Sequence, residues 1–259
     1  MTAPVSQTKF GKNEPFELQV SRSEIPNHRN VTVFGYNADV DTTEVTVWPL
    51  PSIIAHPNAA LQMKVSSTNA NDTSAGTGAR TIVIQGLDAN YAEITDTVTL
   101  NGLTEVLTSK SFLRVNYAYV ATAGSTESAA GDIYIGTGTV TSGVPATVYN
   151  IIKYDFNNTV TGHYTIPAGY TGYLSQGLFS AGQVTGSTQV RGRLLTAGTD
   201  GIRRTAAVTT VNNGVADYVF EYPLRIEEKT DIEATGVGSA ANNGVSCMFI
   251  ILLVKNTTN

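Results

Sequence analysis

Short segments in which apolar and polar residues alternate recur along most of this chain, and turn residues separate them. From Ile94 to Leu100, for example, threonine occupies every second position, and three of the four residues between are apolar. The dipeptide Asn101-Gly102, which favours a tight turn, follows that segment. No segment carries apolar residues at helical spacing over ten residues. We therefore predict an all-β protein of antiparallel sheets, because strands at intervals of ~8–12 residues are typical of sandwiches and barrels.

The composition supports this fold class and excludes several functions. Charged residues make up 14% of the chain, against ~25% in an average soluble protein. Thr, Gly, Asn and Ser replace them, and these residues favour strands and turns. The net charge of -5 offers no basic excess, so we expect no nucleic-acid partner. No apolar run reaches the ~20 residues of a membrane helix, so we expect no membrane partner.

The chain is long enough for two domains. Its 259 residues fit two units of ~120 residues, and the Gly-, Thr- and Ser-rich stretch 137–146 lies between two groups of expected strands. Residues 1–15 are polar and aperiodic, and we interpret them as an extended N-terminal arm that becomes ordered only on assembly. We predict two tandem β-sandwich domains of jelly-roll type, at 16–145 and 146–259.

Two local predictions concern the first domain. The segment Phe16–Arg22 alternates apolar and polar residues, which indicates a strand. The segment Ser67–Gly78 consists almost entirely of small polar residues. It cannot build a core, so we expect a long exposed loop there.

The chain shows no residue spacing that is typical of a catalytic or metal site. His28, His56 and His163 are far apart in the sequence, and no Gly-x-Ser-x-Gly motif occurs. Asp39 and Asp41 lie in a turn-rich loop without the glycine and glutamate of a calcium loop, so only a weak calcium site built from several loops stays open. We expect no catalytic residue, no metal, no cofactor and no enzymatic activity. The single cysteine, Cys247, lies in an apolar run and is expected to be a buried, inert thiol.

The candidate sites are therefore interaction sites. Arg191 and Arg193 would share one strand face, which is either a solvated or salt-bridged face or a docking surface for an acidic neighbour. Two groups of tyrosines could stack on sugars, although a place in the core or at an interface is the commoner role. The groups are Tyr117, Tyr119 and Tyr134, and Tyr164, Tyr170 and Tyr173. We predict interface residues at Thr2, Lys9, Phe10, Pro15, Arg191 and Arg193, and ligand-facing aromatic residues at Tyr170 and Tyr173.

Several stretches, taken together, resemble a family of virion structural proteins from tailed phages of aquatic bacteria, including cyanophages. They are Phe16–His28, Phe34–Pro49, Asn71–Gly102, Ser111–Gly124, Gly131–Val140, His163–Leu174 and Pro223–Gly236. The resemblance covers nearly the whole chain, and the combination of ARTIVIQGLDANYAEI with TLNG is its most specific part. It implies a place in the virus particle and supplies no catalytic residues.

The resemblance implies a non-enzymatic virion structural protein that is made in the host bacterial cytoplasm. Within a virion we expect a capsid decoration or cement protein, a homotrimer that contacts the major capsid protein. A neck or tail component, such as a ring, adaptor or baseplate protein, is the alternative. A carbohydrate- or receptor-binding module of the tail is a further alternative.

Overall fold

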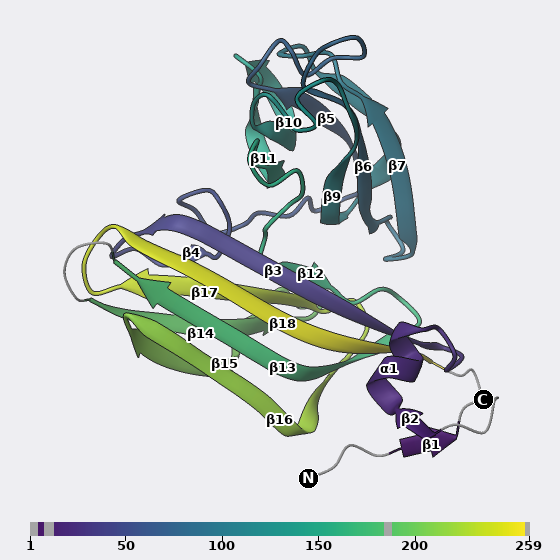
Figure 1. Cartoon of the computed structure of the whole chain (residues 1–259), viewed down its shortest axis with the longest axis vertical. Coiled ribbons are helices and arrows are strands. Elements are labelled where there is room, and N and C mark those ends of the chain that lie inside the picture. Colours follow the sequence, from purple (N-terminus) through teal and green to yellow (C-terminus); the bar gives the residue numbers. More distant parts are fainter. Residues whose placement is uncertain (1–4, 8–12, 184–187, 257–259) are drawn as a thin grey trace.

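The protein is an all-β molecule built from antiparallel sheets (Figure 1). A computed structural model describes residues 5–7, 13–183 and 188–256. This part of the chain contains eighteen strands and one short helix, and no helix in it is long and apolar enough to cross a membrane. The strands form two bodies: the larger body holds β3, β4 and β12 to β18, and the smaller body holds β5 to β11.

The larger body consists of two sheets that enclose one core. One sheet has the order β16-β13-β18-β3, and the other has the order β12-β17-β14-β15 with β4 paired to β17. Val33 and Phe179 from the first sheet and Ile232 from the second belong to the same buried cluster. The strands are β3 (His28–Val40), β4 (Val45–Thr46), β12 (His163–Thr165), β13 (Tyr170–Gly182), β14 (Gln189–Ala197), β15 (Arg203–Asn212), β16 (Gly214–Ile226), β17 (Asp231–Gly238) and β18 (Asn243–Lys255).

Strand β18 shows how alternation in the sequence sets this core. Along β18 buried and half-buried residues alternate almost without interruption, because successive side chains of a strand point to opposite faces. Cys247, Phe249 and Ile251 point into the core. Cys247 is buried, as the sequence predicted, and its burial raises the pKa of the thiol to about 12.

The smaller body also has two sheets around one core. Their orders are β11-β10-β5-β8 and β7-β6-β9. Met63, Ile84 and Ile133 are completely buried between them. The strands are β5 (Leu61–Ser67), β6 (Ala79–Leu87), β7 (Glu93–Thr99), β8 (Val106–Phe112), β9 (Arg114–Ala123), β10 (Ile133–Thr141) and β11 (Val144–Ile152).

The two bodies differ from the predicted division of the chain at residue 145. Strand β3 pairs with β18 and β4 pairs with β17, although both precede the smaller body in the sequence. Strand β11 crosses the predicted boundary and pairs with β10. The smaller body is therefore an insertion between β4 and β12. Composition could not reveal this arrangement, because pairing between the two ends of a chain leaves no local signal in the sequence.

The segment predicted as the first strand is a helix. Helix α1 spans Phe16–Ser21 and buries Gln19 and Val20. Pro15 lies at its N-terminus, and Ser23, with a φ of 58°, lies just beyond its end in the left-handed region. Fewer than two turns are too short for helical periodicity to show. Within the predicted arm, β1 (Val5–Gln7) pairs with β2 (Asn13–Pro15).

The long polar segment Ser67–Gly78 was predicted to be an exposed loop, but only half of its residues are exposed, and a buried carboxylate organises it. Asp72 is fully buried. It accepts hydrogen bonds from the backbone N–H groups of Ala79 at 2.7 Å, Ala130 at 2.8 Å and Gly131 at 2.9 Å, and from Ser67 Oγ at 2.5 Å. One side chain thus holds the loop against the segment before β10. The small residues allow this approach, since a Cβ at Gly78 would lie 2.2 Å from Asp72 Oδ1.

Candidate functional site at the junction of the two bodies

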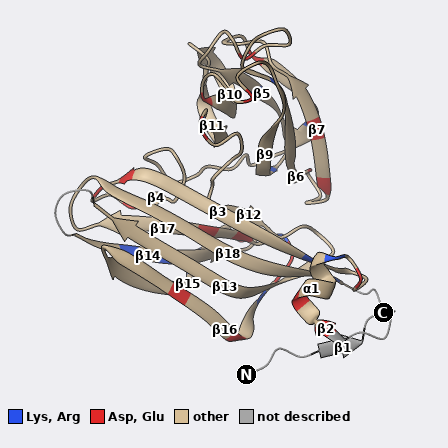
Figure 2. Cartoon of the chain, in the orientation of Figure 1, with Lys and Arg blue, Asp and Glu red and all other residues tan. Residues whose placement is uncertain are grey.

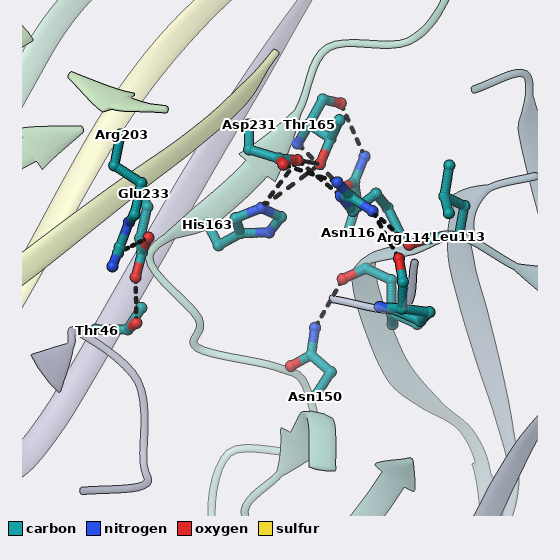
Figure 3. A network of polar contacts seen from close by, with 12 residues as sticks. Thr46, Leu113, Arg114, Asn116, Asn150, His163, Thr165, Arg203, Asp231 and Glu233 are labelled. Atoms are coloured by element: carbon teal, nitrogen blue, oxygen red, sulfur yellow. Dashed lines mark hydrogen bonds and ion pairs between the residues drawn. The ribbon is translucent and has the colours of Figure 1, made fainter. Parts of the chain in front are cut away.

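An ion pair joins the two bodies (Figure 3). Arg114, at the start of β9 in the smaller body, donates from Nε to Asp231 Oδ1 at 2.8 Å and from Nη2 to Oδ2 at 2.9 Å. Asp231 begins β17 in the larger body. The side chains are only 11% and 15% exposed. A bidentate ion pair fixes both the distance and the relative orientation of the two side chains. This pair therefore sets how the two bodies are joined.

Thr165 extends the junction. Its hydroxyl donates to Asp231 Oδ1 at 2.5 Å, across the pairing of β12 with β17. Its backbone is held by Asn116 of β9, which donates from Nδ2 to Thr165 O and accepts from Thr165 N, both at 3.1 Å. The side-chain amide of Asn116 thus makes the two backbone hydrogen bonds that a neighbouring strand would make with Thr165. It links the smaller body to the edge of a sheet of the larger body.

A second polar group holds the loop that reaches the junction. Glu233 forms an ion pair with Arg203 and accepts a hydrogen bond from the Thr46 hydroxyl (Figure 3). Thr46 Oγ1 accepts in turn from Ile54 N at 2.7 Å. The proline-rich stretch after β4 is therefore tied back to the sheet. It presents His56 to the junction.

Two histidines that are distant in the sequence meet here. The rings of His56 and His163 have centroids 4.3 Å apart. His163 is buried, and its Nε2 lies 3.6 Å from Asp231 Oδ1. Its Nδ1 has no hydrogen-bond partner among the described residues. The expectation that the histidines are dispersed is wrong for this pair, because pairing of β12 with β17 and the loop after β4 bring them together.

The environment shifts the pKa values of two of these groups. Burial, and then the neighbouring His163, hold the pKa of His56 well below its ordinary value. Burial alone would raise the pKa of Asp231. The contacts with His163 and Arg114 outweigh it and hold that pKa far below its ordinary value. Asp231 is therefore a permanent anion at neutral pH.

The arrangement suits a structural joint better than a reaction centre. One ligand atom from each of His56, His163 and Asp231 lies within 4.8 Å of the others, so these three could approach a metal ion. However, both oxygens of Asp231 already accept from Arg114, and Oδ1 also accepts from Thr165. Thr165 is completely buried, so its hydroxyl is out of reach of a substrate.

The lowered pKa of His56 predicts that the protein loses stability in mild acid. Because the pKa of His56 in the folded protein is well below its ordinary value of about 6.5, the unfolded chain binds the proton more readily. The melting temperature should therefore fall as the pH drops below about 6.5. The contribution of Asp231 is complete above the ordinary carboxyl pKa of about 3.9 and is lost only below it. Calorimetry from pH 8 to 5 should show a smaller fall for His56→Gln, and equal falls in both proteins would contradict this assignment.

Of the predicted interface residues, those that the structure describes make none of the hydrogen bonds or ion pairs of the Arg114–Asp231 junction. Thr2, Lys9 and Phe10 lie outside the described residues, and Pro15 ends β2. On β14, Arg191 is exposed, whereas Arg193 is half-buried in an ion pair with Glu44. Thr235 donates a further hydrogen bond to Glu44 at 2.6 Å. Arg193 thus belongs to a salt-bridged sheet face, the simpler of its two interpretations.

The predicted ligand-facing tyrosines do not form a pair. Tyr170 and Tyr173 are three residues apart on β13 and therefore point to opposite faces. Tyr170 packs against the core, with the Arg29 guanidinium 4.9 Å from its ring centroid. Both tyrosines are half-buried. The large exposed aromatic residues lie elsewhere, on β3, β9, β16 and the segment after β11.

An exposed apolar surface on β15 and β16 is the largest feature that the sequence reasoning missed. Both strands lie at the edge of their sheets. Tyr222 is 84% exposed and Val219 is 75% exposed. We call the set of these and four further exposed apolar residues the edge surface: Ile202, Val208, Val215, Tyr218, Val219 and Tyr222. The sequence did carry a signal for this surface. Both faces of β16 carry large apolar residues, which a strand with one face in solvent would not need.

Comparison with known proteins gives little. No family model and no curated protein matches the chain. Solved structures with some likeness include T=1 particles derived from infectious bursal virus, at 11% identity over 90% of this chain and 74% of that chain, with a TM-score of 0.19. The T13 particle of infectious bursal disease virus gives 10% identity over 94% of this chain and 79% of that chain, with a TM-score of 0.21. Likeness at this level carries no argument about fold or function.

Proposed function

We propose that this chain is a non-enzymatic virion structural protein, a capsid decoration or cement protein that acts as a homotrimer and binds the major capsid protein. The edge surface is the observation that carries this proposal. Six exposed apolar residues gather on and beside two edge strands, and exposed apolar patches mark contact sites. Exposed strand edges are likewise open to pairing with another chain. A partner must therefore cover β15 and β16.

The low proportion of charged residues supports binding to neighbouring proteins through many shallow apolar and polar contacts. Most of the ribbon carries uncharged residues (Figure 2), in line with the charged fraction of 14%. Charged groups are costly to strip of water, and interface cores are depleted in them. Weak contacts of this kind gain strength when the symmetry of a shell repeats them.

We further propose that the larger body is a jelly roll and the smaller body a second sandwich. The strand orders support this assignment. From β13 to β18, the chain passes between the two sheets in the sequence first, second, second, first, second, first, with β3 in the first sheet and β4 in the second. Two Greek keys give this order in a jelly roll, an architecture of viral capsid and lectin domains. The fold is compatible with the proposed role without assigning it.

Charge placed in the edge surface tests the proposal. Val219→Asp should convert the oligomer into monomers in sedimentation velocity, because a carboxylate would be buried without a partner at the contact. Leu107→Asp, at a 53% exposed position on β8 of the smaller body, is the matched control and should leave the oligomer intact. Wild-type protein that sediments as a monomer, or an oligomer that persists in Val219→Asp, would contradict self-association through this edge.

A further inference from the structure

A cleft separates strand β3 of the larger body from the sheet β7-β6-β9 of the smaller body, and nothing described so far uses it. Its volume is about 730 Å³, within the range of ligand sites. The segment that leads from β11 towards β12 joins the two sides. Thr159 N donates to Ala118 O of β9 at 2.9 Å, and Tyr36 N of β3 donates to Val160 O at 3.0 Å. An ion pair between Arg29 and Glu93 also connects the walls.

One wall is a row of three side chains across the sheet of the smaller body. In register, Gln85 of β6 pairs with Thr95 of β7 on one side and with Tyr117 of β9 on the other. All three residues are exposed and line the cleft. Among the described residues, neither the Gln85 amide nor the Tyr117 hydroxyl has a hydrogen-bond partner. The row therefore offers an amide, a hydroxyl and an aromatic ring to a ligand.

The opposite wall repeats this chemistry along β3. Asn30, Thr32 and Phe34 alternate with the inward-pointing Val31 and Val33, so they share one face. They line the cleft and are exposed, Phe34 to 54%. Each wall thus carries one carboxamide, one threonine and one aromatic ring. Because each of these residues is exposed, none of them is needed to fill the core.

We infer that this cleft binds a neutral oligosaccharide. Sugars present hydroxyl groups that both donate and accept, and amides and hydroxyls match that pattern. Their C–H faces pack on aromatic rings, which combine an apolar body with, in tyrosine, a polar tip. The charged lining residues, Arg29 and Glu93, neutralise each other, so an anionic ligand gains no net attraction. A peptide would need apolar pockets for alternate side chains, whereas Gln85 and Thr95 on one wall and Asn30 and Thr32 on the other place polar groups in the cleft.

Binding to defined neutral glycans tests this inference on the full chain. The probes are chitotetraose, maltotetraose and cellotetraose, followed by an array of neutral glycans, with saturation-transfer NMR and calorimetry as readouts. At least one neutral glycan should bind. Tyr117→Ala should weaken it about tenfold, which corresponds to about 1.4 kcal/mol. Gln85→Ala, on the neighbouring strand, should weaken it independently.

Tyr154→Ala is the control, because Tyr154 is a more exposed aromatic residue between β11 and β12, outside both the cleft and the edge surface. It should leave glycan affinity unchanged, and melting temperatures should show that all variants are folded. Failure of every neutral glycan to bind would overturn the inference. Binding that survives both Tyr117→Ala and Gln85→Ala, or binding of acidic glycans or peptides alone, would overturn it as well. Neither result would bear on oligomer formation through the edge surface.

Discussion

Replacing Asp231 with alanine should destabilise the protein by about 3–5 kcal/mol, because the substitution leaves the Arg114 guanidinium buried without a counter-charge. Arg114 is 11% exposed, so water cannot replace the carboxylate. Thr165 Oγ1 loses its acceptor at the same time. Urea unfolding monitored by circular dichroism measures the change. Asp231→Asn should lose almost as much, since it keeps the volume and removes the charge.

The partner substitution shows whether the loss arises from the pair. Arg114→Met removes the charge that Asp231→Ala would leave without a partner. The double variant Asp231→Ala/Arg114→Met should therefore be more stable than the sum of the two single effects predicts. Glu227→Gln, which breaks a pair exposed by more than half on both sides, is the control and should cost about 0–1 kcal/mol. A cost below 1 kcal/mol for Asp231→Ala, or strict additivity in the double variant, would contradict a junction held by this pair.

Asp72→Ala should have a comparable effect on the smaller body, about 3–5 kcal/mol. Three backbone N–H groups and the Ser67 hydroxyl lose their acceptor, and each unsatisfied buried donor costs about 1–3 kcal/mol when it cannot reach water. Hydrogen exchange should accelerate at Ala79, Ala130 and Gly131 before other amides of the smaller body. The same urea titration gives the total loss.

Asp155→Ala is the matched control for Asp72, since Asp155 is an exposed aspartate between β11 and β12. Its removal should change stability by no more than about 0.5 kcal/mol. Gly78→Ala provides an independent probe, because its Cβ would press on the Asp72 carboxylate. Full stability and unchanged exchange in Asp72→Ala would show that the loop is held by other contacts.

Local alternation predicted the fold class, and pairing between distant strands determined the rest. The alternating residues from Val245 to Val254 form a strand, because the side chains on one face of that strand fill the core. By contrast, nothing near β3 indicates that it pairs with β18, so the insertion of the smaller body could not be read from the sequence. Helix α1 was missed because Pro15 and a left-handed Ser23 enclose fewer than two turns.

The junction could not be predicted for the same reason. His56, His163 and Asp231 come from a loop and two strands that are separated widely in the sequence. Their spacing in the sequence carries no motif. The sequence predicted the cleft only in part. Tyr117 was among the tyrosines expected to be able to stack on sugars. Only the strand register shows that Gln85 and Thr95 lie beside it.

The copy number of this chain in intact virus particles tests the proposed function most directly. Quantitative mass spectrometry of purified particles gives its ratio to the major shell protein. For a decoration protein on an icosahedral lattice, this ratio should be one or a simple fraction. A handful of copies per particle would contradict the decoration role and favour a neck or tail position, and absence from the particle would contradict a virion role altogether.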